Sequence, residues 1–255
     1  MIFYFSSTGN SLTTAKQLAK LLQDEYTVMG SEAIEKDYSR ESRIGFVFPT
    51  FFCSVPKFIK DFMMKIRLNS KAYIYLVNTC GGVQGVSLYH AKKVLEKRGL
   101  KVSYAKSISM PDNTATIYSS SMAMDSLRGQ KKFVSMIAKD ISNGKTDVAE
   151  AKFTLFGAVT DAIGGPAMKL MANIMISDKD KCVGCGLCAK VCPMQNIEIV
   201  DGRPQFSKNC VDCMSCLHWC PQAAIHFKVG SFSKERQYHH PDVRLAEILE
   251  ERKKA

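Results

Sequence analysis

The residues with the clearest chemistry are eight cysteines that form two runs with the same spacing. In each run, two residues separate the first three cysteines from one another, three residues precede the fourth, and a proline follows it. Every cysteine of the first run recurs 28 residues later in the second. Thiolates clustered this closely are typical of a metal centre, because a disulfide framework spreads its cysteines along the chain. The runs are Cys182, Cys185, Cys188, Cys192 and Cys210, Cys213, Cys216, Cys220.

A second candidate site is the hydroxyl-rich turn Ser6-Ser7-Thr8-Gly9-Asn10-Ser11. It follows the apolar run Ile2–Phe5 and precedes leucines and alanines at helical spacing, so we expect a strand, a turn and a helix. Hydroxyl and backbone N–H groups at the beginning of a helix suit a phosphate group. The same residue types also cap helices that bind nothing, and this turn alone does not separate the two interpretations.

Strands that alternate with helices must position these residues. Apolar runs occur at residues 2–5, 26–29, 44–48, 72–77 and 102–108, and helical patterns follow several of them. The pattern predicts an α/β fold with a doubly wound parallel sheet of five strands. In such a sheet the ligand crevice lies at the carboxyl ends of the strands. The loops after 44–48 and 72–77 are therefore expected to meet the hydroxyl-rich turn there, which favours the phosphate-binding interpretation.

The hydroxyl-rich turn resembles the phosphate loop of flavodoxins, and the resemblance covers about residues 1–145. That family binds FMN non-covalently, which implies that Ser6, Thr8, Asn10 and Ser11 bind the phosphate and that Gly9 permits a close backbone approach. The two loops that embrace the flavin ring in that family correspond here to Pro49, Thr50, Phe51, Phe52, Cys53 and Ser54, and to Asn78, Thr79, Cys80, Gly81 and Gly82. The first of these loops has no tryptophan, so ring stacking is expected from Phe51 or Phe52.

The cysteine runs resemble those of bacterial ferredoxins that carry two 4Fe-4S clusters, over about residues 178–228. Zinc is the alternative metal, but a structural zinc site needs only four cysteines, and the spacing in both runs is that of these ferredoxins. In those ferredoxins the fourth cysteine of each run ligates the other cluster. The resemblance therefore implies one cluster held by Cys182, Cys185, Cys188 and Cys220, and a second held by Cys210, Cys213, Cys216 and Cys192.

Four segments follow from these patterns: a flavodoxin-like FMN-binding domain at 1–145, a helical connector at 146–177, a small α+β two-cluster ferredoxin-like domain at 178–228, and a tail at 229–255. The apolar stretch Phe153–Ile176 contains two charged residues and is interrupted by Gly164-Gly165-Pro166, so we expect two short buried helices instead of a membrane span. Helices are also expected over Ser119–Asn143 and Val243–Lys253. His239 and His240 are expected at the surface, and a return of the tail over the flavin pocket is the alternative.

The net charge of +11 lies mainly in the N-terminal part, where residues 1–150 carry 21 lysines and arginines against 13 acidic residues. A basic surplus attracts an acidic electron-transfer protein or an anionic substrate, and an ordinary solvated surface is the simpler interpretation. Nucleic acid is disfavoured because no stripe of arginine and aromatic residues accompanies the charge. The first residues lack the features of a secretory signal, so a cytoplasmic location without membrane insertion is expected.

Together the two domains resemble the flavodoxin-ferredoxin fusion proteins of anaerobic bacteria and archaea. Flavin exchanges one or two electrons and each cluster exchanges one, so their combination converts between the two kinds of electron transfer. We expect an FMN- and iron-sulfur-dependent oxidoreductase whose flavin exchanges electrons or hydride with a small-molecule redox substrate. The alternative is a non-catalytic carrier between protein redox partners. The sequence names no catalytic acid or base and no oligomeric state.

Overall fold

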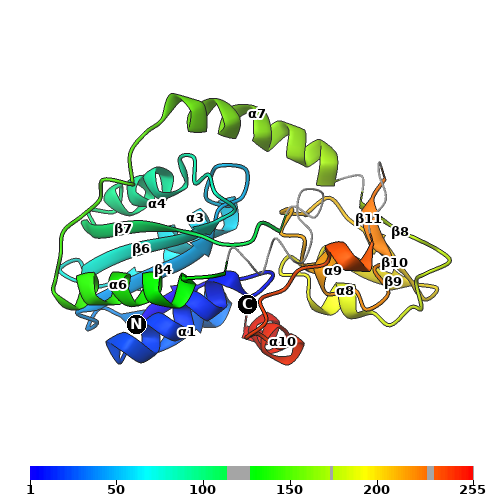
Figure 1. Cartoon of the computed structure of the whole chain (residues 1–255), viewed down its shortest axis with the longest axis horizontal. Coiled ribbons are helices and arrows are strands. Elements are labelled where there is room, and N and C mark those ends of the chain that lie inside the picture. The colour runs from blue at the N-terminus through cyan, green and yellow to red at the C-terminus, as the bar shows by residue number, and fades with distance from the viewer. Residues whose placement is uncertain (114–126, 173–174, 229–232, 255) are drawn as a thin grey trace.

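A sheet of five parallel strands, in the order β2-β1-β4-β6-β7, forms the centre of the N-terminal part (Figure 1). The structure is a computed structural model, and it describes residues 1–113, 127–172, 175–228 and 233–254. This is the strand order of doubly wound flavodoxin-like sheets, so the predicted fold class is confirmed. The strands are β1 (Ile2–Tyr4), β2 (Tyr26–Val28), β4 (Arg43–Pro49), β6 (Tyr73–Cys80) and β7 (Val102–Ser109).

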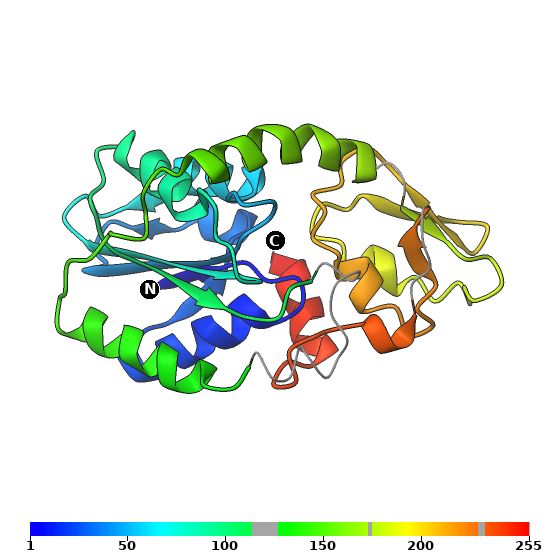
Figure 2. The same cartoon turned by 45° about the horizontal axis from the view of Figure 1, so that its top comes forward.

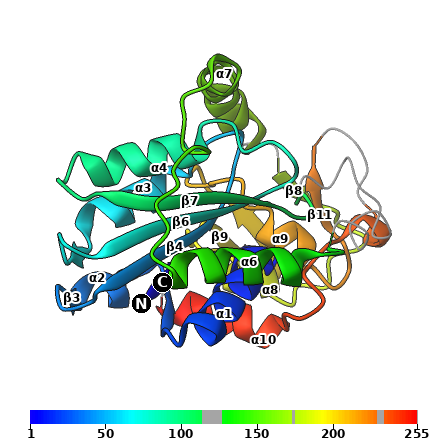
Figure 3. The ribbon, with the colours of Figure 1, turned by 60° about the vertical axis from the view of Figure 1, so that its left-hand side comes forward.

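Helices cover both faces of this sheet (Figure 3). Successive strand residues point to opposite faces, so Val47 packs in the core beneath one pair of helices and Phe46 in the core beneath the other pair. Each core is apolar and buried, which fixes the register of the strands. The first pair is α1 (Asn10–Leu22) and α6 (Gln130–Ser142), and the second is α3 (Lys57–Lys65) and α4 (Ser87–Glu96). The short elements α2 (Ser31–Glu35), β3 (Asp37–Tyr38) and β5 (Arg67–Leu68) complete this part.

The C-terminal part consists of two similar halves. Helix α8 (Leu187–Lys190) and helix α9 (Ser215–His218) are 28 residues apart, like the cysteines. Strand β8 (Met175–Ser177) pairs with β11 (Ile225–Phe227), and β9 (Ile197–Val200) pairs with β10 (Arg203–Phe206), both antiparallel. The sequence repeat is therefore a repeat of structure, and this part is the small α+β domain that was predicted.

Helix α7 (Leu155–Ala172) connects the two parts and arches over them (Figure 1). It is continuous through Gly164-Gly165-Pro166, so the expected pair of short helices is wrong. A proline removes one helical hydrogen bond and each glycine costs about 1 kcal/mol, which weakens a helix without necessarily ending it. The helix is also not buried, because Leu155 and Phe156 are 73% and 67% exposed. No helix in the described part of the chain is long and apolar enough to cross a membrane.

The C-terminal segment passes between the two parts of the molecule (Figure 2). It contains a short 3-10 helix, η1 (Lys234–Arg236), and helix α10 (Leu245–Lys254), which confirms the helix expected there. Ile248 of α10 packs in one core with Leu12 of α1 and with Val191 and Trp219 of the ferredoxin-like part. The helix expected over Ser119–Asn143 is observed as α6 in its second part, and residues 119–126 of that stretch lie outside the described residues.

Candidate functional site

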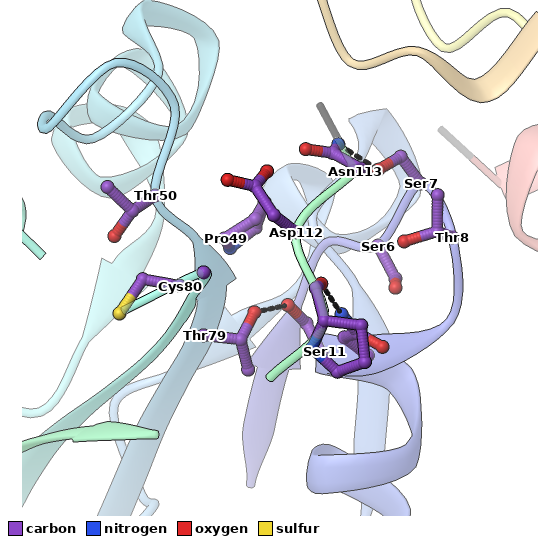
Figure 4. Close-up of a pocket in the computed structure, with 13 residues that line it drawn as sticks. Ser6, Ser7, Thr8, Ser11, Pro49, Thr50, Thr79, Cys80, Asp112 and Asn113 are labelled. Carbon is purple, nitrogen blue, oxygen red and sulfur yellow. Dashed lines mark hydrogen bonds between the residues drawn. The ribbon is translucent and has the colours of Figure 1, made fainter. Parts of the chain in front are cut away.

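The hydroxyl-rich turn and the loops after β4 and β6 meet at the carboxyl ends of the strands (Figure 4). The loop after β7 joins them, and together they line a recess with many hydroxyl groups and no lysine or arginine among the described residues. Such a recess holds an anion through N–H and O–H groups. Its lining residues are Ser6, Ser7, Thr8, Asn10, Ser11, Pro49, Thr50, Thr79, Cys80, Gly81, Pro111, Asp112 and Asn113.

Hydrogen bonds fix the shape of the turn. The hydroxyl of Ser6 accepts the N–H of Gly9 at 3.1 Å, and the hydroxyls of Ser11 and Thr79 lie 2.9 Å apart. Gly9 has φ of +101°, a conformation that other residues rarely adopt. Among the described residues, nothing accepts a hydrogen bond from the backbone N–H of Ser7 or Thr8. These two donors remain available to an anion.

The side chain of Asn10 is used within the protein. Its Nδ2 donates to the carbonyl of Pro111 at 2.9 Å, and its Oδ1 accepts the hydroxyl of Tyr238 at 2.6 Å. The sequence placed Asn10 among the phosphate ligands. In the structure its amide instead ties α1 to the loop after β7 and to the C-terminal segment.

A larger cavity of about 310 Å³ adjoins the recess. Phe51 belongs mainly to the core, whereas Phe52 is 36% exposed with φ of 47°, so Phe52 is the aromatic ring that a planar ligand would meet. Gly81 belongs to both cavities, and Gly82 is not part of either lining. The lining consists of Thr50, Phe51, Phe52, Cys53, Cys80, Gly81, Val83, Asp112, Asn113, Asp212 and Met214.

Asn78 does not line this cavity but contacts one of its lining residues. It is fully buried, and its Nδ2 donates to the hydroxyl of Thr50. Its Oδ1 is buried with no hydrogen-bond partner among the described residues. An unpaired buried acceptor is costly.

Sequence reasoning missed two groups of lining residues. Pro111, Asp112 and Asn113 follow β7, and the rule that located the other loops applies equally to this one. Asp212 and Met214 come from the second cysteine run, and no local sequence pattern predicts that they line this cavity. They depend on how the two parts of the molecule pack together.

The eight cysteines divide between two cavities of the ferredoxin-like part. Cys182, Cys185, Cys188 and Cys220 line an outer cavity. Cys192, Cys210, Cys213 and Cys216 line an inner cavity. The fourth cysteine of each run thus lies with the first three of the other run, as the crossed arrangement requires. Among the described residues, no group of three or more metal-ligating side chains is arranged around a single metal ion.

Backbone N–H groups and burial act in opposite directions on these thiols, since nearby N–H groups stabilise a thiolate and burial disfavours it. The N–H of Asn196 lies 3.3 Å from Sγ of Cys192, and the N–H of Ala224 lies 3.3 Å from Sγ of Cys220. Burial raises the pKa of Cys213 to about 12 and that of Cys188 to about 11. An iron centre offsets this by replacing the proton with positive charge. The arrangement fits cysteine-ligated iron–sulfur chemistry.

The inner cavity shares part of its wall with the 310 Å³ cavity. Asp212 and Met214 line both of them. Asn113 joins the two walls, because its Nδ2 donates to the carbonyl of Cys213 at 3.2 Å. Only one layer of side chains therefore separates the inner group of cysteines from the site beside Phe52.

Comparisons with known proteins agree with this geometry. Residues 172–225 match the family model of the 4Fe-4S dicluster domain. Over 65 residues the chain is 31% identical to Ferredoxin-3 of Nostoc sp., a match that covers 18% of this chain and 67% of that protein. Over 57 residues it is 42% identical to an uncharacterized protein of Methanocaldococcus jannaschii, covering 22% of this chain and 21% of that protein. The chain thus spans about a fifth of the length of this last relative.

A flavodoxin of Megasphaera elsdenii is similar to the N-terminal part, at 17% identity and a TM-score of 0.37. The alignment covers 54% of this chain and 97% of that one. The fold assignment rests on the strand order of the sheet, and 4Fe-4S binding rests on the family model and the ferredoxin match. The C-terminal part of the chain therefore belongs to the 4Fe-4S ferredoxin family, and it is joined to an N-terminal part with a flavodoxin-like fold.

Proposed function

We propose that this chain is an iron–sulfur flavoprotein that passes single electrons between two 4Fe-4S clusters and FMN, and that FMN exchanges electrons or hydride with a small-molecule substrate. The observation that carries the proposal is the wall of Asp212 and Met214, which the inner cysteine cavity and the 310 Å³ cavity share. Centres held on the two sides of this wall would be neighbours, which favours direct electron exchange between them. When bound, FMN supplies two-electron chemistry toward an organic molecule and one-electron chemistry toward a cluster.

The residues of the N-terminal part fit FMN. The N–H groups of Ser7 and Thr8, with the hydroxyls of the recess, would hold the phosphate. The adjoining cavity would hold the ring against Phe52. The loops after β4, β6 and β7 would then set the distance between the FMN ring and the wall of Asp212 and Met214.

The two cysteine cavities fit two clusters at different depths. The inner one, with Cys213 and Cys216, lies toward the N-terminal part. The outer one reaches the surface, because Cys185 is exposed. This arrangement favours exchange with a one-electron protein partner at the Cys185 edge and exchange with a substrate at the flavin end.

The rim of the 310 Å³ cavity favours an uncharged organic substrate. Val83 is 58% exposed there and Phe52 forms part of the same wall, so the approach is apolar. Asp112 and Asp212 also line the cavity, and its described lining contains no lysine or arginine. Carboxylates in the lining disfavour a negatively charged substrate.

An anaerobic reductive titration of the reconstituted protein tests the proposal. Flavin and cluster absorbance are followed together, and small quinones or other uncharged acceptors are then added. We expect stoichiometric FMN, electron equilibration between the flavin and the clusters within one chain, and reoxidation by a small molecule. Retained flavin that is reoxidised only by another redox protein would identify a carrier, and a protein without flavin would refute the flavin assignment.

A further inference from the structure

The ferredoxin-like part and the tail hold the hydroxyl-rich turn from outside. Three successive carbonyl groups of the turn accept hydrogen bonds from these distant segments. Ser6 accepts from Nη2 of Arg252 at 2.7 Å, and Thr8 accepts from the backbone N–H of His240 at 2.7 Å. Ser7 accepts from Nε1 of Trp219 at 2.8 Å and from the hydroxyl of Ser215 at 3.3 Å.

These bonds orient the turn. A peptide carbonyl points away from the N–H of the same peptide bond. A carbonyl drawn outward by Trp219 therefore turns the N–H of the following residue, Thr8, in the opposite direction. Thr8 lines the recess and its N–H has no acceptor among the described residues, so a fixed Ser7 carbonyl also fixes the direction of this available donor.

The donors to Ser7 are neighbours of the cysteines of both cavities. Trp219 precedes Cys220 of the outer cavity, and Ser215 precedes Cys216 of the inner cavity. Trp219 is buried and its ring is stacked on His239, with centroids 4.5 Å apart and planes at 13°. A third link exists in the tail, because Nε of Arg252 donates to the carbonyl of Val191, next to Cys192.

We propose that Trp219 is a positioning residue for the FMN phosphate, through which loading of the 4Fe-4S clusters tightens FMN binding. This rests on the function proposed above. Metal binding orders the segment that carries the ligands, and the segment between Cys210 and Cys220 carries both donors to Ser7. An ordered segment holds Nε1 of Trp219 against the turn. Because coupling between two sites is reciprocal, bound FMN stabilises the clusters by the same factor.

The test measures the FMN dissociation constant anaerobically in four samples: the wild type and Trp219→Phe, each with and without clusters. In cluster-loaded protein we expect Trp219→Phe to weaken FMN binding about five-fold, the effect of one buried hydrogen bond. In cluster-free protein we expect a change below two-fold. Ser215→Ala, which removes the second donor with a smaller change of volume, should act in the same direction.

His239→Ala is the matched control, because it removes the stacking partner of Trp219 and leaves the bond to Ser7. It should change FMN binding less than two-fold. Iron content is measured in every variant, so loss of clusters is not mistaken for loss of the bond. Unchanged FMN binding in both iron-loaded variants, or equal effects with and without clusters, would overturn the inference alone. Wild-type protein that binds no FMN would overturn the proposed function together with it.

Discussion

Asp212 occupies in the second cysteine run the place that Gly184 occupies in the first, and both residues have a left-handed backbone, with φ of 55° and 71°. Met214 and Gly186 repeat this relationship, with φ of 58° and 71°. A residue other than glycine pays about 1 kcal/mol or more for this conformation. The run that lines the 310 Å³ cavity therefore has residues with strained backbones where the other run has glycine. Strain of this kind persists mainly at functional sites.

Replacing Asp212 with glycine should stabilise the fold. The change removes the strained side chain and a carboxyl group whose pKa burial raises to about 6. We expect the free energy of unfolding to rise by about 1 kcal/mol, measured by thermal unfolding of the loaded protein. The reverse change, Gly184→Asp, is the matched control and should destabilise, because a Cβ at Gly184 would lie 2.7 Å from the carbonyl oxygen of Gly202. If both variants lose stability alike, strain at Asp212 is not the cause.

The crossed arrangement of cysteines predicts which cluster each substitution removes. Cys220→Ala should abolish the outer cluster and leave the inner one, because Cys220 lines the outer cavity with Cys182, Cys185 and Cys188. About half of the bound iron should remain, and electron paramagnetic resonance of the reduced protein should show one cluster instead of two. Cys53→Ala, which changes a cysteine outside the inner and outer cysteine cavities, should keep all the iron. Selective loss of the inner cluster in Cys220→Ala would contradict the assignment.

The sheet and the meeting of its loops were predictable because each strand is marked by a local run of apolar residues. The same reasoning located Ser6, Thr8, Thr50 and Thr79 at one edge, since parallel strands place their carboxyl ends together. The 28-residue repeat likewise carried over into helices, strands and left-handed positions. In both cases the information lies within a short stretch of sequence, where spacing is a direct record of local structure.

What depended on distant contacts was not predictable. His240 has the sequence neighbours of a surface residue, yet it is only 2% exposed, because it packs against Gly9 and lies 3.1 Å from Gln130. The expectation that it lies at the surface is wrong, and the tail does return to the hydroxyl-rich turn. The wall formed by Asp212 and Met214 likewise results from the packing of the two parts, which no local spacing records.

Substitution of Gly9 should release FMN and leave the clusters intact. Gly9 has φ of +101°, and a Cβ there would lie 3.0 Å from the Cβ atoms of His240 and Val243. Gly9→Ala therefore strains the turn and pushes it away from the tail that holds its carbonyls. We expect FMN binding to weaken at least ten-fold, which corresponds to about 1.4 kcal/mol, with iron content unchanged.

Gly99→Ala provides the control for Gly9→Ala. Gly99 also has a left-handed backbone, with φ of +73°, but a Cβ there would meet open space. It should lower the free energy of unfolding by about 1 kcal/mol and leave FMN binding unaffected. Equal FMN affinities in the two variants would show that the contact of Gly9 with the tail does not hold the turn.

The tail should also make stability depend on pH through His240. Its Nδ1 accepts the N–H of Asp242 at 3.1 Å and its Nε2 faces Oε1 of Gln130, an arrangement that suits the neutral ring. Burial lowers the pKa of His240 to about 4, with smaller effects from Asp242, Lys131 and His239. The unfolded chain, with a histidine pKa near 6.5, binds the proton more readily than the folded protein. Stability is therefore complete above about pH 6.5 and falls as the pH drops toward 4.

The variant His240→Asn isolates this contribution. It removes the titrating ring, so its free energy of unfolding should depend less steeply on pH than that of the wild type. The difference between the two free energies of unfolding should change between pH 6.5 and 5 by at most about 1.4 kcal/mol per pH unit. Above pH 7 this difference should no longer depend on pH. Urea unfolding of loaded protein at fixed salt measures both curves, and acid effects on the clusters cancel in the comparison. Parallel curves would mean that His240 stays exposed to solvent and that the tail does not close on the turn.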